Sequence, residues 1–397
     1  MRNLLFISGS VGLGHVTRDL AVVAALRALR KDVAVSWLAA HPASLVLEQA
    51  GESLLPECAQ YANESVEAEA ASRGYGLDMM GYLMRARRAW ARNVKLFERL
   101  AHSGRFDVVV GDETYELNVA QMKYPAINPL PYFCFYDFIG MDAVTRNPVD
   151  RLMTYGWNWI WARDWKLYGR EKNKALFVGE PQDVADRPFG WLLPNRREYA
   201  SLYYHFVGYI LGFDPTQLAD RRAVRARLGY GEEPLVVCSV GGTAVGRDLL
   251  QLCAQAYPAL RASIPGVRMV LVAGPRIAPD SLSVPAGVEV KGHVPALHEH
   301  FAASDLCVVQ GGGTTTLELT ALKRPFLYFP LEGHFEQEVA VAGRLARHHA
   351  GERMRFSQTT PEALAARIAA NISQPVAYAS IKTDGASAAA AMISAAL

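Results

Sequence analysis

The sequence is poor in cysteine. Five cysteines are spread over 397 residues, and no two form a Cys-x-x-Cys pair. An odd, widely spaced set fits neither a disulfide framework nor a zinc site. We therefore predict a protein of the reducing cytoplasm without disulfide bonds.

Long apolar runs and an excess of one charge are also absent. No stretch approaches the roughly 18 apolar residues needed to span a bilayer, and the first run, Leu4–Ile7, is shorter than the about 7–15 residues of a signal-peptide core. Lys and Arg number 41 against 39 Asp and Glu, which gives no global field to attract nucleic acid or anionic lipid. We predict no nucleic-acid partner, and any membrane contact must be local and peripheral.

What the sequence does contain is material for large cores. Hydrophobic residues make up 51% of the chain and charged residues 20%, a composition that excludes a disordered protein. A single core rarely grows beyond about 250–300 residues. The length of 397 residues therefore predicts at least two domains.

Short, uninterrupted apolar runs recur along the chain, each followed by a Gly-, Ser- or Asp-containing loop and then by helical periodicity. The runs are Leu4–Ile7, Val33–Leu38, Asp107–Val110 and Pro131–Phe135, followed later by Leu235–Cys238, Arg268–Val272, Val288–Val290, Leu306–Val309 and Pro325–Phe329. Continuous apolar strands separated by helices are typical of parallel sheets covered on both faces. We predict an α/β protein with two doubly wound parallel-sheet domains.

The pattern breaks between about Met141 and Leu235, where proline and aromatic residues dominate. Gly and Pro punctuation places the linker near Val207–Pro215. The domains are therefore expected at residues 1–207 and 216–375, and Pro361 is expected to begin a helix with Glu362 in its first turn.

The first chemical motif follows the first predicted strand and runs from Ser8 to Val16. Its glycines let a ligand approach the backbone, and the helix that follows would favour a negative charge at its N-terminus. The spacing is not that of a dinucleotide fingerprint. His15, next to Gly14, would lie at the sheet edge where ligands bind in such folds, either as a functional group or as a capping or packing histidine.

The second motif, Gln310–Glu318, combines three glycines with three threonines between a strand and a helix. Backbone N–H groups, hydroxyls and the helix dipole would make a phosphate cradle. The motif has no P-loop lysine, and a tight turn capped by threonine is the alternative reading. The loops at Gly242-Thr243 and Pro330–Gln337 follow other predicted strands at the same edge.

These residues resemble a known family. Gly14-His15-Val16 and the block Gly292–Gln337 resemble the GT-B glycosyltransferases, in the branch with the peptidoglycan lipid-intermediate N-acetylglucosaminyltransferase and the UDP-glucosyl and glucuronosyltransferases. The resemblance implies two domains facing across a cleft, the first binding the acceptor and the second a nucleoside diphosphate sugar. It also implies that a last helix within residues 376–397 packs back on the first domain.

The resemblance assigns donor contacts residue by residue. Glu318 matches the acid on the ribose hydroxyls, Thr314 and Thr315 the polar pair beneath the diphosphate, and Glu336 and Gln337 the pair on the sugar. The full expected donor set is Gly14, Gly242, Thr243, His293, Val294, Gln310, Gly312, Gly313, Thr314, Thr315, Glu318, Glu336 and Gln337, with His293 and Val294 bracketing the base. Gln310 departs from the family, because many relatives carry His there. The Pro330–Glu336 loop is about two residues longer than in the plant-type enzymes, which leaves the sugar open.

The same resemblance makes His15 the general base that takes the proton of the acceptor hydroxyl, a role suited to a pKa near neutrality. Asp112 follows a predicted strand and would orient the imidazole, although it could instead cap a helix or leave that role to Glu113. The sequence has no Asp-x-Asp motif. We therefore expect amides and hydroxyls, with no metal and no other cofactor, to meet the charge of the leaving diphosphate.

The expected activity is an inverting, metal-independent transfer from a UDP- or dTDP-sugar to a hydroxyl on a natural product, lipid or glycan. An epimerase or hydrolase of the same fold, a non-catalytic sugar-nucleotide sensor and a peripheral membrane scaffold are the alternatives. Residues Met79–Arg99 fit a basic amphipathic helix that could lie on an anionic membrane or pack its apolar face in the first domain. The indole-rich stretch Tyr155–Trp165 suits sugar or lipid contact, or a core.

Overall fold

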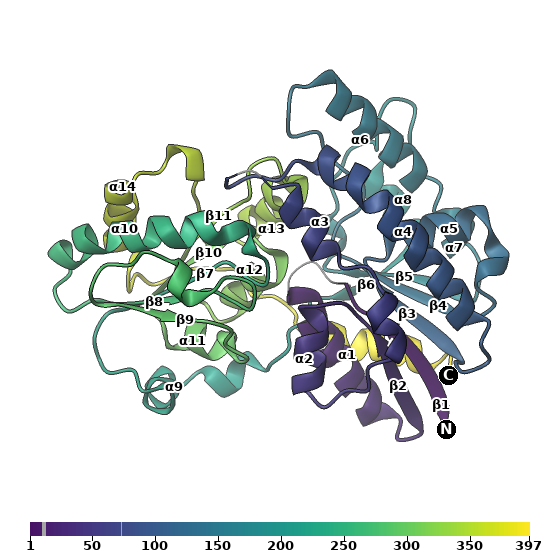
Figure 1. Ribbon diagram of the computed structural model, residues 1–397, viewed down its shortest axis with the longest axis horizontal. Coiled ribbons are helices and arrows are strands. Elements are labelled where there is room, and N and C mark those ends of the chain that lie inside the picture. Colours follow the sequence, from purple (N-terminus) through teal and green to yellow (C-terminus); the bar gives the residue numbers. More distant parts are fainter. Residues whose placement is uncertain (10–12, 73) are drawn as a thin grey trace. The chain divides into compact units, whose positions relative to one another are not determined.

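The computed structural model describes residues 1–9, 13–72 and 74–397 (Figure 1). The chain forms two compact units. Unit 1 comprises residues 1–70, 79–212 and 382–397, and unit 2 comprises residues 71–78 and 213–381. The change of unit between Gly212 and Phe213 lies inside the stretch expected to hold the linker. Residues Ser10, Val11 and Gly12 of the first glycine motif lie outside the described residues.

Unit 1 is built on a six-stranded sheet in the order β2-β1-β3-β4-β5-β6. The strands are β1 (Arg2–Ile7), β2 (Val33–Leu38), β3 (Val108–Asp112), β4 (Tyr132–Tyr136), β5 (Asn173–Val178) and β6 (Tyr204–Gly208), and their pairings are parallel. Every residue of β3 and β4 is buried, as expected for strands covered on both faces.

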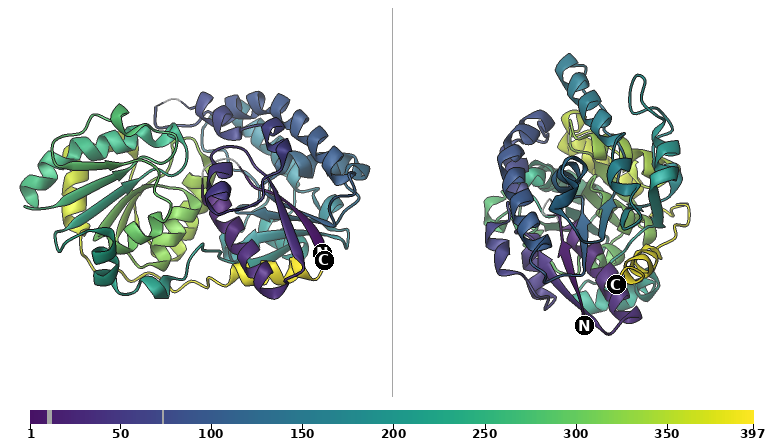
Figure 2. Two further views of the ribbon diagram at one scale, coloured as in Figure 1. Left: turned by 60° about the horizontal axis from the view of Figure 1, so that its bottom comes forward. Right: turned by 90° about the vertical axis from the view of Figure 1, so that its right-hand side faces the viewer.

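Helices cover this sheet (Figure 2). They are α1 (Gly14–Leu29), α2 (Ala43–Gln49), α3 (Glu64–Ala70), α4 (Met79–Ala101), α5 (Tyr115–Lys123), α6 (Pro148–Trp161), α7 (Trp165–Tyr168), α8 (Arg196–Tyr203) and α15 (Gly385–Ser394). The last of these, α15, packs against α1 and buries Ala389, Ala390 and Ile393 in the same core as β1. The C-terminal segment therefore completes unit 1, as the family resemblance implied, although its helix begins at Gly385 rather than near residue 376.

Unit 2 holds a second six-stranded parallel sheet in the order β12-β11-β10-β7-β8-β9. Its strands are β7 (Leu235–Ser239), β8 (Arg268–Val272), β9 (Val288–Lys291), β10 (Leu306–Gln310), β11 (Phe326–Phe329) and β12 (Glu352–Arg353). The helices are α9 (Arg221–Leu228), α10 (Arg247–Ser263), α11 (Leu297–Ala303), α12 (Gly313–Ala321), α13 (Ala342–Arg347) and α14 (Pro361–Asn371), with a π-helical turn at Glu336–Val341.

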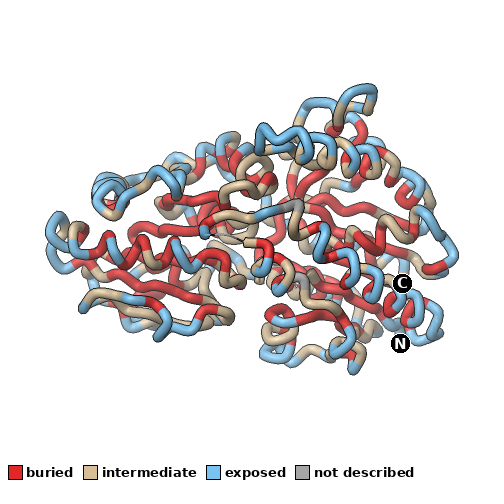
Figure 3. Tube along the Cα trace, turned by 45° about the horizontal axis from the view of Figure 1, so that its top comes forward, coloured by how far each residue is buried: buried red, intermediate tan, exposed pale blue. Residues whose placement is uncertain are grey.

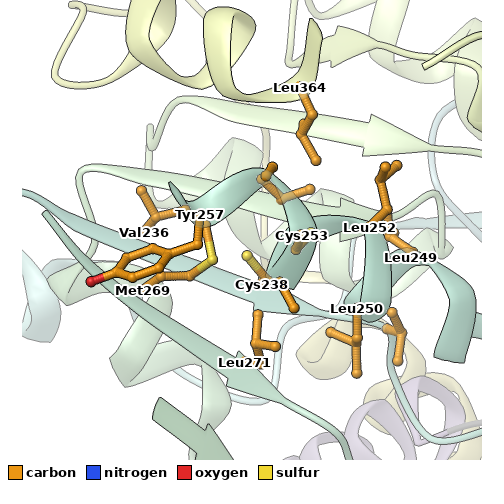
Figure 4. Close-up of a cluster of buried hydrophobic side chains, with 14 of the residues drawn as sticks. Val236, Cys238, Leu249, Leu250, Leu252, Cys253, Tyr257, Met269, Leu271 and Leu364 are labelled. Atoms are coloured by element: carbon orange, nitrogen blue, oxygen red, sulfur yellow. The ribbon is translucent and has the colours of Figure 1, made fainter. Parts of the chain in front are cut away.

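Unit 2 has a core on each face of its sheet, one beneath α10 and α14 and the other beneath α9, α11, α12 and α13. Figure 4 shows Cys238 and Leu271 from the strands, Cys253 and Tyr257 from α10 and Leu364 from α14 in the first of these cores. Along the chain, the buried segments are these central strands and the inner helix faces (Figure 3). The five cysteines, all within the described residues, are free thiols, so the prediction of no disulfide bond is confirmed.

Three features were not foreseen from the sequence. Strands β5 and β6 lie in the stretch expected to break the pattern, because β5 opens with two polar residues and β6 is a half-exposed edge strand. The short β12 was also missed. Residues 71–78 belong to unit 2 although both flanking helices belong to unit 1.

The helix expected at Met79–Arg99 is α4. Leu83 and Phe97 are buried, so its apolar face does pack in unit 1, whereas Arg88, Arg92 and Lys95 are exposed. In the indole-rich stretch, Trp161 is buried while Trp159 and Trp165 are about half exposed. None of the described helices combines the length and the apolarity that crossing a bilayer requires.

Candidate active site

The two neighbouring strands β1 and β3 bring His15 and Asp112 together. Both loops leave the carboxyl edge where the strand order reverses, which is the usual ligand site of an open α/β sheet. His15 is the second residue of α1 and Asp112 the last of β3, and 3.1 Å separates His15 Nδ1 from Asp112 Oδ2. Gly9 permits this approach, since a Cβ there would lie 3.3 Å from the Asp112 carbonyl oxygen and 3.4 Å from the His15 ring.

Arg18 completes this pair, and sequence reasoning missed it. Its Nε donates to Asp112 Oδ2 at 3.1 Å, its Nη2 donates to Asp112 Oδ1, and its Nη1 donates to Asp137. The guanidinium and the Asp112 carboxylate are both buried. Arg18 lies three residues after His15 in α1, so the helical spacing, which places both on one face, was the signal available in the sequence.

The hydrogen bonds decide which nitrogen of His15 can act as a base. Arg18 Nη2 lies 3.0 Å from His15 Nδ1, but a guanidinium only donates. Nδ1 therefore cannot accept from Arg18 while it donates to Asp112. With Asp112 ionised and paired to Nδ1–H, the proton acceptor on neutral His15 is Nε2.

Charge around the imidazole favours its protonated form. Burial opposes protonation of His15, but the carboxylates of Asp112 and Glu113 outweigh both burial and Arg18 and raise its pKa to about 10. Burial also opposes ionisation of Asp112, yet Arg18 and His15 hold its pKa well below the usual range. The imidazole is therefore a cation at neutral pH until a ligand or a pH change removes its proton.

Glu113 faces the other side of the ring. Its Oε2 lies 3.7 Å from His15 Nε2, and its backbone has a φ of +51°, a left-handed conformation that a residue with a side chain adopts at a cost. Its N–H donates to the Phe135 carbonyl at 3.1 Å. Both acids considered from the sequence thus flank His15, Asp112 at Nδ1 and Glu113 near Nε2, and Asp112 does not cap α5, whose N-cap is Thr114.

In unit 2, the corresponding reversal of strand order lies between β7 and β10. Gln310 ends β10, and Gly312 is the N-cap of α12 without any side-chain cap. The alternative of a turn capped by threonine is therefore wrong, and Thr316 instead donates to the carbonyl of Gly312 at 2.8 Å.

The start of α12 offers several unused donors. Within the described parts of the chain, the backbone N–H groups of Gly313, Thr314 and Thr315 have no hydrogen-bond acceptor, and the hydroxyls of Thr314 and Thr315 have no partner. The first N–H groups of a helix together with its dipole make an anion site. The buried Gln310 Oε1 is also without a partner among the described residues.

The loop after β11 lies against this turn. A Cβ on Gly311 would come 3.0 Å from the Cα of Pro330, and one on Gly313 would come 3.7 Å from Glu336 Oε1. Gln337 Oε1 accepts from the Leu331 N–H at 2.8 Å. Glu336 thus borders the start of α12. The side-chain oxygen of Gln337, in contrast, already accepts a hydrogen bond within its own loop.

A second arginine that the sequence analysis missed lies beside the same turn. Arg344 of α13 is buried and donates from Nη2 to the carbonyl of Gly313 at 2.6 Å. It places a guanidinium next to the predicted phosphate cradle, where Gln310 provides no charge. No spacing in the sequence connects a residue of α13 with this loop.

Of the remaining donor candidates, Gly242 and Thr243 lie next to the end of β10, whereas the others lie further along the sheet or in unit 1. Gly242 and Thr243 follow β7, and the nearby Gly246 approaches Gln310, whose Oε1 would lie 3.0 Å from a Cβ there. His293 and Val294 follow β9, with β8 in between. Gly14 begins α1 in unit 1.

Glu318 points from α12 into a buried environment. It is 8% exposed, and burial raises its pKa to about 8. In the described parts of the chain its carboxyl group has no hydrogen-bond or ion-pair partner, which is unusual for a buried acid. This carboxyl group is therefore available to a ligand.

Comparisons with known proteins find similarity to glycosyltransferases. Residues 236–394 match the glycosyltransferase family 28 C-terminal domain. An "uncharacterized glycosyltransferase" of Methanopyrus kandleri is 31% identical over 143 residues, covering 36% of this chain and 40% of that protein. A lipid-A-disaccharide synthase of Pseudomonas fluorescens is 37% identical over 127 residues, covering 31% and 33%.

A UDP-N-acetylglucosamine–N-acetylmuramyl-(pentapeptide) pyrophosphoryl-undecaprenol N-acetylglucosamine transferase of Carboxydothermus hydrogenoformans is 23% identical over 168 residues, covering 40% of this chain and 44% of that protein. In each of these cases the matched stretch spans less than half of the relative's length.

Solved structures match along the whole chain. The spinosyn rhamnosyltransferase SpnG superposes with a TM-score of 0.57 at 18% identity, covering 100% of this chain and 96% of that one. The glycosyltransferase SnogD from Streptomyces nogalater gives a TM-score of 0.56 at 18% identity, covering 100% and 99%. The chain therefore has the GT-B fold, and the resemblance seen in its motifs is confirmed.

Proposed function

We propose that the protein is a glycosyltransferase that moves a sugar from a nucleoside diphosphate sugar, held by unit 2, to a hydroxyl of an acceptor held by unit 1. The observation that carries this proposal is the set of unused donors at the start of α12, located where the strand order of a GT-B unit reverses. Backbone amides and hydroxyls in that position suit a diphosphate. The acceptor classes are natural products, lipids and glycans.

Donor recognition follows from the same loops. The Gly313–Thr315 amides and the two threonine hydroxyls bind the diphosphate, and Arg344 adds the positive charge that Gln310 does not supply. Glu318 accepts hydrogen bonds from the ribose hydroxyls, and Glu336 from the sugar. A UDP- or dTDP-sugar is the expected donor, with the base bracketed by His293 and Val294.

Transfer is a displacement at the anomeric carbon. The acceptor oxygen forms the new C–O bond as the bond to the diphosphate breaks, and the diphosphate leaves with the electron pair. The acceptor proton passes to Nε2 of neutral His15, and Asp112 stabilises the imidazolium that forms. Attack opposite the leaving group inverts the anomeric configuration.

The leaving charge is met without a metal in this proposal. Preorganised N–H groups, hydroxyls and a guanidinium can stabilise a developing anion as a metal would, and Arg344 adjoins the amides that would do so. The absence of an Asp-x-Asp motif, the usual metal-binding acid pair, supports the same conclusion.

The test incubates the full chain with UDP- and dTDP-sugars, with and without a mixed acceptor extract and excess chelator. We expect free nucleotide and a new glycoside only when donor and acceptor are both present, and turnover in chelator. Thr315→Val should slow transfer, whereas Thr320→Val, whose buried hydroxyl only donates to the Thr316 carbonyl, should not.

Each contrary outcome points to a defined alternative. Nucleotide release without acceptor would indicate a hydrolase, and donor binding without any turnover would indicate a sensor. Activity lost in chelator and restored by Mg²⁺ or Mn²⁺ would overturn metal independence.

A further inference from the structure

Within the segment Ala71–Asp78, the described residues form a small hairpin that belongs to unit 2, although α3 before it and α4 after it belong to unit 1. Ser72 and Leu77 pair in an antiparallel bridge, and the Asp78 N–H donates to the Ala71 carbonyl at 3.0 Å. The two short arms are therefore tied to each other. A segment between two helices of unit 1 therefore forms part of unit 2.

Tyr75 anchors the hairpin. Its side chain is 5% exposed and packs in the core between the sheet and α10. Its hydroxyl donates to the Phe329 carbonyl at 2.7 Å, and its ring stacks on Phe356 with 4.5 Å between centroids. A buried aromatic ring with a satisfied hydroxyl holds a short segment firmly.

The hairpin pairs directly with the loop that follows β11. The Glu332 N–H donates to the Tyr75 carbonyl at 3.2 Å, and the Leu77 N–H donates to the Glu332 carbonyl at 3.1 Å. Gly76 and Glu332 form a parallel bridge. The loop backbone at Glu332 thus behaves as an extra strand residue whose partner is the hairpin.

The fit leaves no room for a side chain at the next loop position. Gly333 has a φ of +83°, and a Cβ there would lie 3.0 Å from the Leu77 carbonyl oxygen. Glu336 begins the π-helical turn three residues later. The backbone that leads to Glu336 is therefore fixed on one side by Gln337, which bonds Leu331, and on the other by the hairpin.

We propose that this hairpin is a specificity element of the donor site, with Tyr75 as a positioning residue for the sugar-recognition loop 330–337. The inference rests on the proposed function, in which Glu336 contacts the sugar. Most groups assigned to the nucleotide and diphosphate lie outside the loop 330–337, in α12, after β9 and, for Arg344, in α13. Gly311 also keeps a hydrogen bond of its own to the Phe329 carbonyl, at 2.9 Å. Loss of Tyr75 should therefore alter sugar recognition and spare nucleotide recognition.

The experiment compares full-length wild type with Tyr75→Ala, Tyr75→Phe and Tyr257→Ala. Tyr257 is a matched control, because it is also 5% exposed, packs in the same core and donates to a backbone carbonyl, that of Val267, away from the loop. Calorimetry measures the affinity of each protein for UDP, dTDP and a panel of the corresponding nucleotide sugars.

For Tyr75→Ala we expect nucleoside diphosphate affinity within about twofold of wild type, and a loss of about tenfold in the preference for the best sugar over the others, as expected when a few positioning hydrogen bonds are lost. Tyr75→Phe keeps the ring and should lose less. Tyr257→Ala should leave the order of sugars unchanged. Hydrogen exchange should be faster at the Glu332 and Leu77 amides in Tyr75→Ala than in Tyr257→Ala.

Two results would overturn the inference: an unchanged sugar preference in Tyr75→Ala, or a parallel fall in nucleotide and nucleotide-sugar affinity. If Tyr75→Ala does not fold, Leu77→Pro gives the same test, because it removes the N–H that pairs with the Glu332 carbonyl at a partly buried position outside the core. If wild type binds nucleotide and neither Tyr75→Ala nor Leu77→Pro changes the sugar preference, the role of the hairpin is refuted and the proposed function is not. A wild type that binds no nucleotide refutes the proposed function itself.

Discussion

The His15 imidazole lies between two carboxylates, Asp112 at one ring nitrogen and Glu113 near the other, and this placement sets the pH dependence of the proposed transfer. A base must be deprotonated to act, and the value of kcat/KM follows the protonation state of the protein without ligand. Because the pKa of His15 is raised to about 10, kcat/KM should rise with pH well above neutrality.

His15→Ala should retain donor affinity and lose about 10²–10⁴-fold in transfer, the usual contribution of general base catalysis. Glu113→Gln should shift the rising limb of kcat/KM to lower pH, because one of the charges that stabilise the imidazolium is gone. Steady-state profiles between pH 6 and 10, with stopped-flow donor binding as the control, test both. A profile that is flat from neutrality upward would remove His15 from the base role.

Arg18 is a positioning residue for the same pair. Removing one partner of a buried ion pair costs about 3–5 kcal/mol, so Arg18→Gln should destabilise unit 1 by roughly that amount in urea denaturation. Because Arg18 also lowers the pKa of His15, the same variant should move the rising limb to higher pH. Arg18→Lys keeps the charge but not the paired geometry. It should bring the rising limb of kcat/KM closer to its wild-type pH than it brings the free energy of unfolding to its wild-type value. Equal recovery of both quantities would contradict this expectation.

Glu318 makes stability depend on pH with a definite sign. Its pKa is raised to about 8 from 4.5, so the folded state binds its proton more tightly than the unfolded state. The contribution of this group to the free energy of unfolding is largest below pH 4.5, its pKa in the unfolded chain. It falls by about 1.4 kcal/mol per pH unit as the pH rises from there toward 8.

Glu318→Gln should therefore melt higher than wild type at pH 8 and equally at pH 4, while binding the nucleotide more weakly for lack of a charged acceptor. Thermal melts across this range and calorimetry at pH 8 measure the two effects. A variant that is less stable than wild type at pH 8 would show that the carboxyl group is ionised and satisfied in the folded protein.

At the level of helices and strands, α4 presents Arg85, Arg88, Arg92 and Lys95 to solvent, and these four have no acidic partner among the described residues. Each cation near an anionic bilayer adds about 1 kcal/mol of attraction. Arg88→Gln should therefore weaken binding to phosphatidylglycerol vesicles by about fivefold. Arg261→Gln, exposed on α10 of the other unit, is the matched control. If wild type, Arg88→Gln and Arg261→Gln sediment equally with anionic vesicles, α4 does not bind membranes. The same follows if wild type binds neutral vesicles as well as anionic ones.

The same level shows what the sequence could and could not predict. Strands such as Val33–Leu38 and Arg268–Val272 were foreseen because strands covered on both faces are mostly apolar, and the ends of adjacent strands brought His15 and Asp112 together as expected. Arg18 and Arg344 were missed because an arginine reads as surface until its buried partners are known. The hairpin 71–78 was missed because its pairing with Glu332 is separated by more than 250 residues and has no local signature.

At the scale of the whole molecule, the C-terminal segment returns to unit 1, so the last two helices of the chain, α14 and α15, stabilise different units. Ile393 of α15 and Ile368 of α14 are both fully buried, the first in the core of unit 1 and the second in that of unit 2. Truncating a buried isoleucine to alanine costs about 2–5 kcal/mol, and the cost falls on the core that contains it.

Ile393→Ala should therefore lower the unfolding midpoint of unit 1 and leave nucleotide affinity intact, because the donor loops belong to unit 2. Ile368→Ala should do the reverse, weakening nucleotide binding as unit 2 opens. Urea denaturation followed by hydrogen exchange, with peptides from β4 reporting on unit 1 and from β8 on unit 2, resolves the two. If Ile393→Ala instead exposes β8 as readily as β4, the two units unfold as one cooperative body, and the last sixteen residues, 382–397, stabilise both of them.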